Sequence, residues 1–294
     1  MNQSRRNLLA GLLWTAPWWL GFLLLLLVPM GWSLYISFCD YSLLQPPVFV
    51  GARNYMGLAA DPMFHKVVAN TLLYSLLAVP LGAVVAVLLA LLLNTRVRGQ
   101  AFFRACVFVP TVVPLTAAAV VWMWMLNPEA GIFNLPWRWL GLAPPNWFNA
   151  PAAAMAALVI VSVWFVGAPT VIYLAGLQEI PEELYEAAKL DGAGPLGRFR
   201  HVTLPGISPI VLFNVIIAIL TAWQIFALPY ILWRGQRGPD NGAYFYTMYL
   251  FDNAFRFLKM GYASAMAWIQ LLIVLAMTAL VFWVSRRRVY YRGA

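Results

Sequence analysis

Residues 180–205 read IPEELYEAAKLDGAGPLGRFRHVTLP and differ sharply in character from the rest of the chain. Of the 294 residues, 63% are hydrophobic and only ten are acidic. Four of those ten lie in this one segment, at Glu182, Glu183, Glu186 and Asp191. Because charged groups are costly to place in apolar surroundings, the segment is expected to face water between apolar elements.

The apolar runs around this segment are long enough to cross a bilayer, which takes roughly 20 helical residues. The chain has a mean hydropathy of +0.77 and 10% charged residues, whereas soluble domains carry about 25%. This pattern predicts an all-α, polytopic membrane protein with six transmembrane helices in a single domain, residues 1–294. The six runs cover residues 11–38, 71–93, 105–126, 152–176, 207–233 and 262–284.

The first run begins in NQSRRNLLAGLLW, which is similar to a twin-arginine export signal. It continues to Phe38, well beyond the roughly 7 to 15 apolar residues of a signal peptide, and no small-x-small cleavage site follows it closely. The first helix is therefore expected to remain as a membrane anchor.

The distribution of Lys and Arg predicts the orientation, because cytoplasmic connections retain positive charge. Twelve of the 19 Lys and Arg residues fall on the side shared by the two termini, and seven fall on the opposite side. Both termini are therefore expected in the cytoplasm. Basic loops facing anionic lipid also account for the pI near 9.8 without any nucleic acid.

Several kinds of site are missing from the sequence. No G-x-x-x-x-G-K-[ST] loop is present to cradle ATP phosphates, and neither H-E-x-x-H nor G-x-S-x-G occurs. The six apolar runs contain no Asp, Glu, Lys, Arg or His, which argues against proton relays and intramembrane catalysis. We therefore expect no catalytic residue, bound cofactor or metal in this chain, and another component must supply the energy for any transport.

The charged segment itself predicts a helix–turn–helix. Pro181 suits the first helical position, and Glu182 and Glu183 fall in the first turn, where the helix dipole favours carboxylates. Gly192 is expected to end this helix, since glycine tolerates left-handed geometry, and Pro195 can begin a second short helix.

Two interpretations of this segment are open from its chemistry. It can be an amphipathic connector at the membrane surface, but such helices are normally rich in Lys and Arg, which this one is not. Small alanines beside Glu186 instead suit a knob inserted into a groove of a cytosolic partner, with the carboxylate fixing the geometry.

EAAKLDGAGPLGRFRHVTLP, residues 186–205, resembles the EAA loop of binding-protein-dependent ABC importer permeases. LQEIPEELY, residues 177–185, resembles the carbohydrate-uptake branch of that family. Similarity to the family extends over residues 98–134, 164–181 and 222–255. One departure is WRGQRGP, residues 233–239, which is longer than the family's usual glycine-rich turn.

The resemblance implies a type I ABC importer permease fold, with residues 179–206 acting as a coupling loop. The loop would dock in a cleft of an ATPase subunit, whose closure would switch the membrane helices between inward- and outward-facing states. Glu186 would make the charged contact, and Gly192 would shape the turn. The full set of residues implied for coupling is Glu182, Glu186, Ala187, Ala188, Asp191, Gly192, Ala193 and Phe199.

The same resemblance implies a multi-pass protein of a prokaryotic cytoplasmic membrane that acts in a heteromeric complex. Its partners would be a second, related permease chain, two ATPase subunits that carry ATP and Mg²⁺, and an extracytoplasmic solute-binding protein. Connections near residues 39–70, 127–151 and 234–261 would face the binding protein.

Neutral polar and aromatic residues within the apolar runs are candidates for a substrate path. Ordinary hydrogen bonding between helices explains such residues equally well. Rings that cover sugar faces and amides that bond hydroxyls nevertheless suit a neutral sugar or oligosaccharide. The candidates are Tyr173, Asn214, Thr221, Trp223, Gln224 and Tyr230.

Two other functions are compatible with the residues. A membrane-embedded enzyme acting on lipid or glycan would turn over its substrate alone, whereas a permease would be inert without an ATPase. A membrane scaffold would recruit a cytosolic protein through the charged segment and transport nothing.

Overall fold

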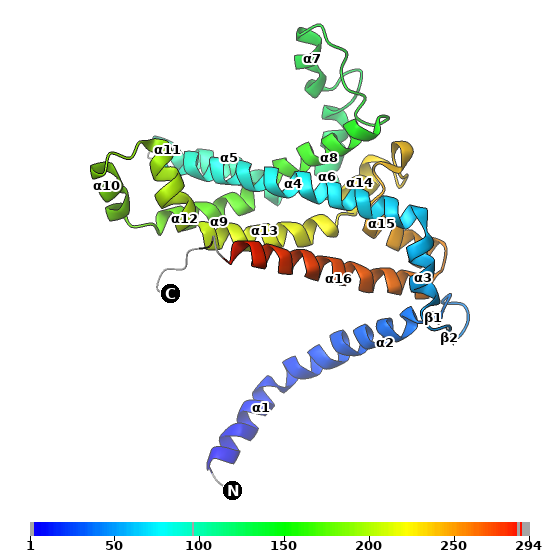
Figure 1. Cartoon of the computed structure of the whole chain (residues 1–294). Helices are drawn as coiled ribbons and strands as arrows, with labels where there is room; N and C mark the ends of the chain where they lie inside the picture. The colour runs from blue at the N-terminus through cyan, green and yellow to red at the C-terminus, as the bar shows by residue number, and fades with distance from the viewer. Residues whose placement is uncertain (1–2, 96, 287–288, 290–294) are drawn as a thin grey trace. The chain divides into compact units, whose positions relative to one another are not determined.

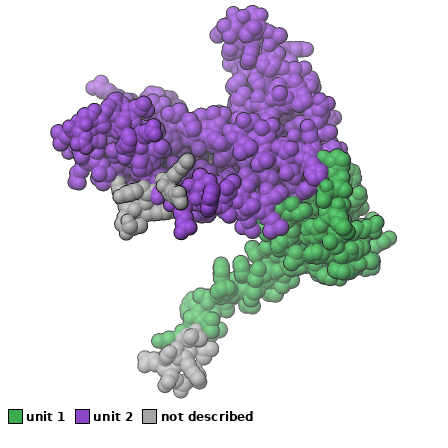
Figure 2. Space-filling view, in the orientation of Figure 1, with its two compact units in different colours: residues 1–62, 250–271 green, residues 63–249, 272–294 purple. Residues whose placement is uncertain are grey.

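The computed structural model describes residues 3–95, 97–286 and 289. Its Cα positions divide into two compact units, one of residues 1–62 and 250–271 and the other of residues 63–249 and 272–294 (Figure 2). Both are built almost entirely of helices, as Figure 1 shows. The only sheet in the described residues is the short antiparallel pair β1 (Cys39–Asp40) and β2 (Val48–Phe49).

The first unit begins with a long apolar helical span. α1 (Gln3–Gly21) and α2 (Val28–Ser37) are joined by a π-helical stretch, and together they provide an uninterrupted apolar helix over Ala10–Ser37. Trp14 and Trp18 are exposed on it. A helix that is apolar and exposed all round suits lipid rather than water, which agrees with the anchor expected at residues 11–38.

A set of polar contacts holds the end of this span to the rest of the first unit, which includes α3 (Arg53–Ala60) and the start of α16 (Met260–Ser285). The Asn54 amide donates to the carbonyls of Ser37 at 2.8 Å and Cys39 at 2.9 Å. The Tyr262 hydroxyl donates to the Asp61 carboxylate at 2.8 Å. These bonds satisfy backbone groups where the span ends and fix where α16 starts.

The second unit contains most of the remaining helices. In chain order they are α4 (Pro62–Asn94), α5 (Gln100–Val112), α6 (Leu115–Met125), α7 (Leu135–Trp139), α8 (Pro151–Trp164), α9 (Gly167–Gln178), α10 (Glu182–Leu190), α11 (Pro195–Arg198), α12 (Leu204–Gly206), α13 (Ser208–Trp223), α14 (Ala227–Leu232) and α15 (Tyr246–Phe251). In Figure 1, α10 and α11 lie at one end of this unit, and α7 and α14 lie at the other.

The apolar runs do not all form straight helices. Within the described residues three helices are long and apolar enough to span a membrane, and there are up to six spans if each bent pair counts as one. The pair α5 and α6 is bent by 102°, α8 and α9 by 48°, and the entry into α13 by 67°. Val113 is extended because a residue before proline avoids the helical region, and Pro114 then precedes α6.

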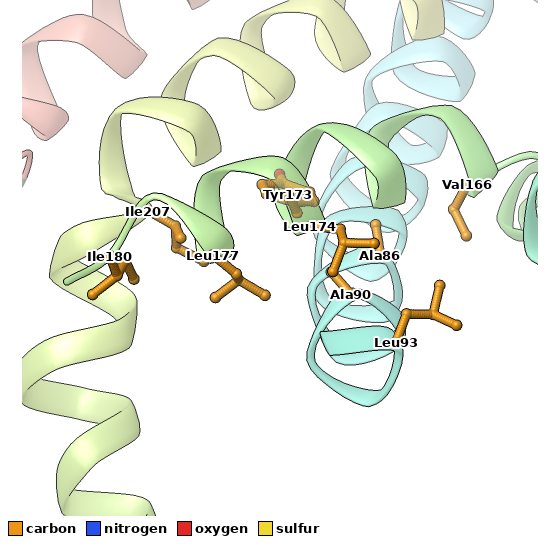
Figure 3. Close-up of a cluster of buried hydrophobic side chains, with 9 residues drawn as sticks. All are labelled: Ala86, Ala90, Leu93, Val166, Tyr173, Leu174, Leu177, Ile180 and Ile207. Atoms are coloured by element: carbon orange, nitrogen blue, oxygen red, sulfur yellow. The ribbon is translucent and has the colours of Figure 1, made fainter. Parts of the chain in front are cut away.

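One buried core of the second unit lies next to the charged segment. It is formed by α4, α9 and the start of α13. Figure 3 shows its buried side chains on these elements. They are Ala86, Ala90, Leu93, Val166, Tyr173, Leu174, Leu177, Ile180 and Ile207. The two alanines of α4 are fully buried. Small side chains at that position let two helices approach closely, as is usual between membrane helices.

Candidate functional site

The acidic helix α10 begins one residue later than the sequence suggests. Pro181 is extended, with φ −57° and ψ 136°, and precedes the helix instead of occupying its first position. Glu182 and Glu183 then lie in the first turn and Lys189 in the last. These three charges therefore lie at the helix ends whose dipole they complement. Each such interaction stabilises an exposed helix by about 0.3–1 kcal/mol.

The predicted stop at Gly192 is confirmed, and its geometry is a complete Schellman cap. Gly192 has φ +79°. Its N–H donates to the Lys189 carbonyl at 3.0 Å, and the Ala193 N–H donates to the Ala188 carbonyl at 2.9 Å. These two bonds satisfy carbonyls that the helix end would otherwise leave open, and they turn the chain sharply towards α11.

One face of α10 is open to solvent in the described chain. Glu182, Glu186, Ala187 and Asp191 are exposed, and the side chain of Leu190 is 89% exposed. No residue of α10 is buried. A short helix that presents leucine, alanine and carboxylates together to solvent has the composition of a helix that docks in a groove.

The opposite face of α10 is fastened to the unit through Tyr185, a residue that the sequence reasoning missed. The Tyr185 hydroxyl lies 3.0 Å from Oγ1 of the buried Thr203, and Tyr185 packs against the core of α4, α9 and the start of α13. Tyr185 and Ala188 are both half-buried, three residues apart. That spacing is the signal in the sequence that marks the inner face of the helix.

The two ends of the charged segment lie in close contact with each other. A Cβ on Gly206 would lie 2.7 Å from Ile180 Cδ1, so the chain entering α10 and the chain leaving α12 touch directly. One turn further into the unit, a Cβ on Gly176 would lie 1.9 Å from Ile210 Cδ1. A Cβ at either position would force an isoleucine side chain to shift, and these close approaches pack α9 against the start of α13.

The two remaining predicted coupling residues lie after the turn. Ala193 is half-buried, and Phe199 is half-buried at the start of a π-helical stretch, Phe199–Thr203, that continues α11. The structure therefore brings all eight predicted coupling residues onto one helix–turn–helix. Their contact with an ATPase stays a prediction.

The six predicted path residues do not form one cluster. Tyr173 is buried in the core of Figure 3, and Trp223 is buried with its ring 6.0 Å from that of Tyr246. Asn214 and Thr221 each donate to the carbonyl four residues earlier, at 3.1 and 2.9 Å. Both bonds lie within α13 and join no second helix, and the substrate role of the six stays a prediction. Gln224 is exposed, and Tyr230 stacks on Phe226.

Within residues 3–95, 97–286 and 289, no group of three or more His, Cys, Asp or Glu side chains is placed to hold a metal ion. An ion pair joins Arg256 to Asp252 at 3.2 Å, far along the sequence from the charged segment.

The described chain thus combines apolar helices long enough to span a membrane with an exposed, capped acidic helix between the fourth and fifth apolar runs. Residues 78–290 match the family described as the binding-protein-dependent transport system inner membrane component, and the chain belongs to this family. It is thus a membrane permease component and not an enzyme. The expected all-α permease fold is confirmed.

Relatives cover nearly the whole chain. A probable ABC transporter permease protein of Bacillus subtilis, YesP, is 35% identical over 98% of this chain and 94% of its own length. The trehalose/maltose transport system permease protein MalF of Thermococcus litoralis is 33% identical over 90% of each. A subunit of a bacterial alginate ABC transporter, crystallised in complex with an alginate pentasaccharide-bound periplasmic protein, superposes with a TM-score of 0.81 at 22% identity over 98% of each chain.

Proposed function

We propose that this chain is a permease subunit of an ATP-driven sugar importer and forms half of the translocation path. The observation that carries the proposal is α10, whose outer face is exposed while its inner face is fastened to the core by Tyr185. Force applied to the outer face would reach α9 and α13 through that contact. The family supplies the reason to expect such force from an ATPase.

The coupling role rests on Glu182, Glu186, Ala187, Ala188, Asp191, Gly192, Ala193 and Phe199. Glu186 would make a charge-assisted contact with the ATPase, and the alanine beside it would allow close approach of the groove wall. Gly192 would hold the knob in shape through its cap. ATP and Mg²⁺ would be bound by two ATPase subunits and not by this chain.

A saccharide is supported as cargo by relatives and by the chemistry of the spans. The similar permeases include proteins named for trehalose and maltose, arabino-oligosaccharides and lactose. The apolar runs hold no Asp, Glu, Lys, Arg or His, so a charged solute would lack compensating charge there. A neutral sugar or oligosaccharide passing Tyr173, Asn214, Thr221, Trp223, Gln224 and Tyr230 is the proposed cargo.

The remaining partners follow from the family. They are a second related permease chain, an extracytoplasmic solute-binding protein and the lipid bilayer of the inner membrane, with both termini of this chain in the cytoplasm. In support of the binding protein, a similar permease was crystallised with a periplasmic one.

The test is reconstitution with the ATPase, second permease and binding protein that co-purify with this chain from its own cells. Sugar uptake and ATP hydrolysis are measured in proteoliposomes for the native chain and for Glu186→Ala. Loss of a charged hydrogen bond costs about 1.5–3 kcal/mol, so uptake should fall roughly tenfold or more. Glu129→Ala, an exposed carboxylate in the connection predicted on the opposite side, is the matched control. Unchanged uptake and assembly in Glu186→Ala would remove that residue from its role.

The same experiment distinguishes the importer from a membrane scaffold that transports nothing. It would still bind a cytosolic protein through α10 but would give no ATP-dependent accumulation of any sugar.

A further inference from the structure

A cavity of about 510 Å³ lies in the second unit and is formed by residues outside the charged segment. Its walls are the end of α6, the residues after it, the segment before α8 and the turn after α14. None of the proposed coupling or path residues lines it. The lining residues are Met123, Trp124, Asn127, Pro128, Phe148, Asn149, Leu232, Trp233, Arg234 and Gln236. The last three belong to the turn that is longer than the family's usual one.

Two aromatic residues form a fixed corner of this cavity. The Trp233 indole N–H donates to the Phe148 carbonyl at 3.0 Å, and the two rings meet edge to face with centroids 5.9 Å apart. Trp233 is only 7% exposed. A ring held by both a hydrogen bond and packing loses little freedom when a ligand binds against it.

Trp124 contributes an open ring surface. Its side chain is 77% exposed, although it lines the cavity. A flat indole face presented in this way can cover the apolar C–H face of a sugar ring.

Three amide side chains supply polar groups around these rings, at Asn127, Asn149 and Gln236. The Asn127 Oδ1 already accepts the N–H groups of Glu129 at 2.9 Å and Ala130 at 3.1 Å. These two bonds fix the plane of its amide, so its Nδ2 is held ready to donate. Arg234 is the one charged residue among those that line the cavity.

The turn that carries Arg234 is held in an unusual conformation. Arg234 has φ +51° and Gly235 has φ +75°. The Gly235 N–H donates to the Tyr230 carbonyl at 2.7 Å, and the Arg234 N–H donates to the Ile231 carbonyl at 3.1 Å. A left-handed arginine is unfavourable and persists only where its surroundings demand it. The turn thereby places Trp233 and Arg234 on the same wall.

We propose that this cavity is a saccharide-binding site, distinct from the path through the spans, in which one or two sugar rings lie against Trp124. The proposal rests on the sugar-importer function above. Hydroxyl groups would bond the three amides and the Arg234 guanidinium. The volume falls within the roughly 300–1,000 Å³ of small-molecule sites.

Comparison with a second, more apolar cavity indicates that a saccharide suits the larger cavity better than a lipid acyl chain does. It has a volume of about 230 Å³ and is lined by Leu89, Leu92, Leu93, Val97, Phe103 and other residues of which only Gln100 carries an amide. An apolar ligand gains most from such walls, whereas it would leave the amides of the larger cavity without partners. Aromatic faces combined with amides suit a polyhydroxylated ring.

The test uses the full chain, assembled with its partner subunits in lipid nanodiscs without the binding protein. Saturation-transfer NMR is recorded with maltose, trehalose, lactose and whichever saccharide the uptake assay accepts. We expect transfer to at least one saccharide, at least a fivefold loss of it in Trp124→Ala, and partial retention in Trp124→Phe. Trp139→Ala is the matched control, because Trp139 is 81% exposed in α7 and lies outside the cavity.

Two outcomes would overturn the proposal. The first is no transfer up to about 50 mM sugar, which exceeds the millimolar range of weak sites. The second is transfer that Trp124→Ala leaves unchanged. Because Trp124 is exposed, its truncation does not open the core. Asn149→Ala gives a second check, since it should lose as much saturation transfer as Trp124→Ala does.

The outcome for the cavity is separable from that for the importer function. Uptake that proceeds while saccharide binding is independent of Trp124 overturns the cavity site alone. Trp124-dependent binding without any uptake leaves the site in place and overturns the importer function.

Discussion

The hydroxyl of Tyr185 lies 3.0 Å from Oγ1 of Thr203, and this contact joins the acidic helix α10 to the segment that leads into α13. Thr203 is buried, whereas the residues of α10 on the other side of Tyr185 are exposed. The exposed helix and the buried core are therefore connected through this hydrogen bond, together with the packing of Tyr185 against the core. Physical coupling needs such a contiguous contact between the site that is pushed and the element that moves.

Removing this hydrogen bond should weaken coupling more than assembly. Tyr185→Phe keeps the ring in the core and deletes only the hydroxyl, at a cost of about 0.5–1.5 kcal/mol. We expect fewer sugar molecules imported per ATP hydrolysed, with co-purification of the ATPase unchanged. Thr203→Val and the double variant complete a cycle, and the double variant should be no worse than the poorer single one. Fully additive losses would show that the two side chains act separately.

The left-handed turn after α10 should tolerate only glycine. Gly192→Ala forces a Cβ into φ +79°, which costs about 1–2 kcal/mol. The expected result is a frayed cap and reduced association with the ATPase, measured by co-purification. Gly194→Ala is the control, because Gly194 has φ −67° and open space around its Cα. Equal loss in both variants would argue that the turn geometry is irrelevant.

The contact between α9 and α13 should be sensitive to a single methyl group. Gly176→Ala places a Cβ 1.9 Å from Ile210 Cδ1, and overpacking of this kind costs about 1–3 kcal/mol. We expect a lower thermal unfolding midpoint of the purified chain and partial recovery in the Gly176→Ala, Ile210→Val double variant. Gly82→Ala meets only Val166 at 3.8 Å and should leave the midpoint within error.

The orientation predicted from Lys and Arg can be checked by labelling. In a Cys106→Ser background, which removes the exposed native thiol, Leu190→Cys should react only with reagents that reach the cytoplasm. Leu140→Cys, also on an exposed leucine, should react with impermeant reagents added outside intact cells. Labelling of both positions from one side would overturn the six-span topology with α10 in the cytoplasm.

Local rules account for what could be predicted of the site. Gly192 ends α10 because left-handed geometry is a property of one residue, and Pro114 bends the third run because proline constrains the residue before it. The resemblance of residues 186–205 to the EAA loop also indicated the family, since that residue pattern lies in one continuous stretch, and the family match over residues 78–290 confirms it. Tyr173 shows where such rules end, because its spacing suggested a path while its surroundings are the core.

The sequence by itself determined that this protein is helical and membrane-spanning with a charged segment between apolar runs, because hydropathy, capping and turn formation depend on near neighbours in the chain. Its resemblance to a known family indicated a permease. The tertiary structure alone decided that Tyr185 meets Thr203, that Gly176 receives Ile210, and that Trp124 and Trp233 line one cavity. Those relationships depend on how separate helices bend and pack against one another, and no spacing within a single run encodes that arrangement.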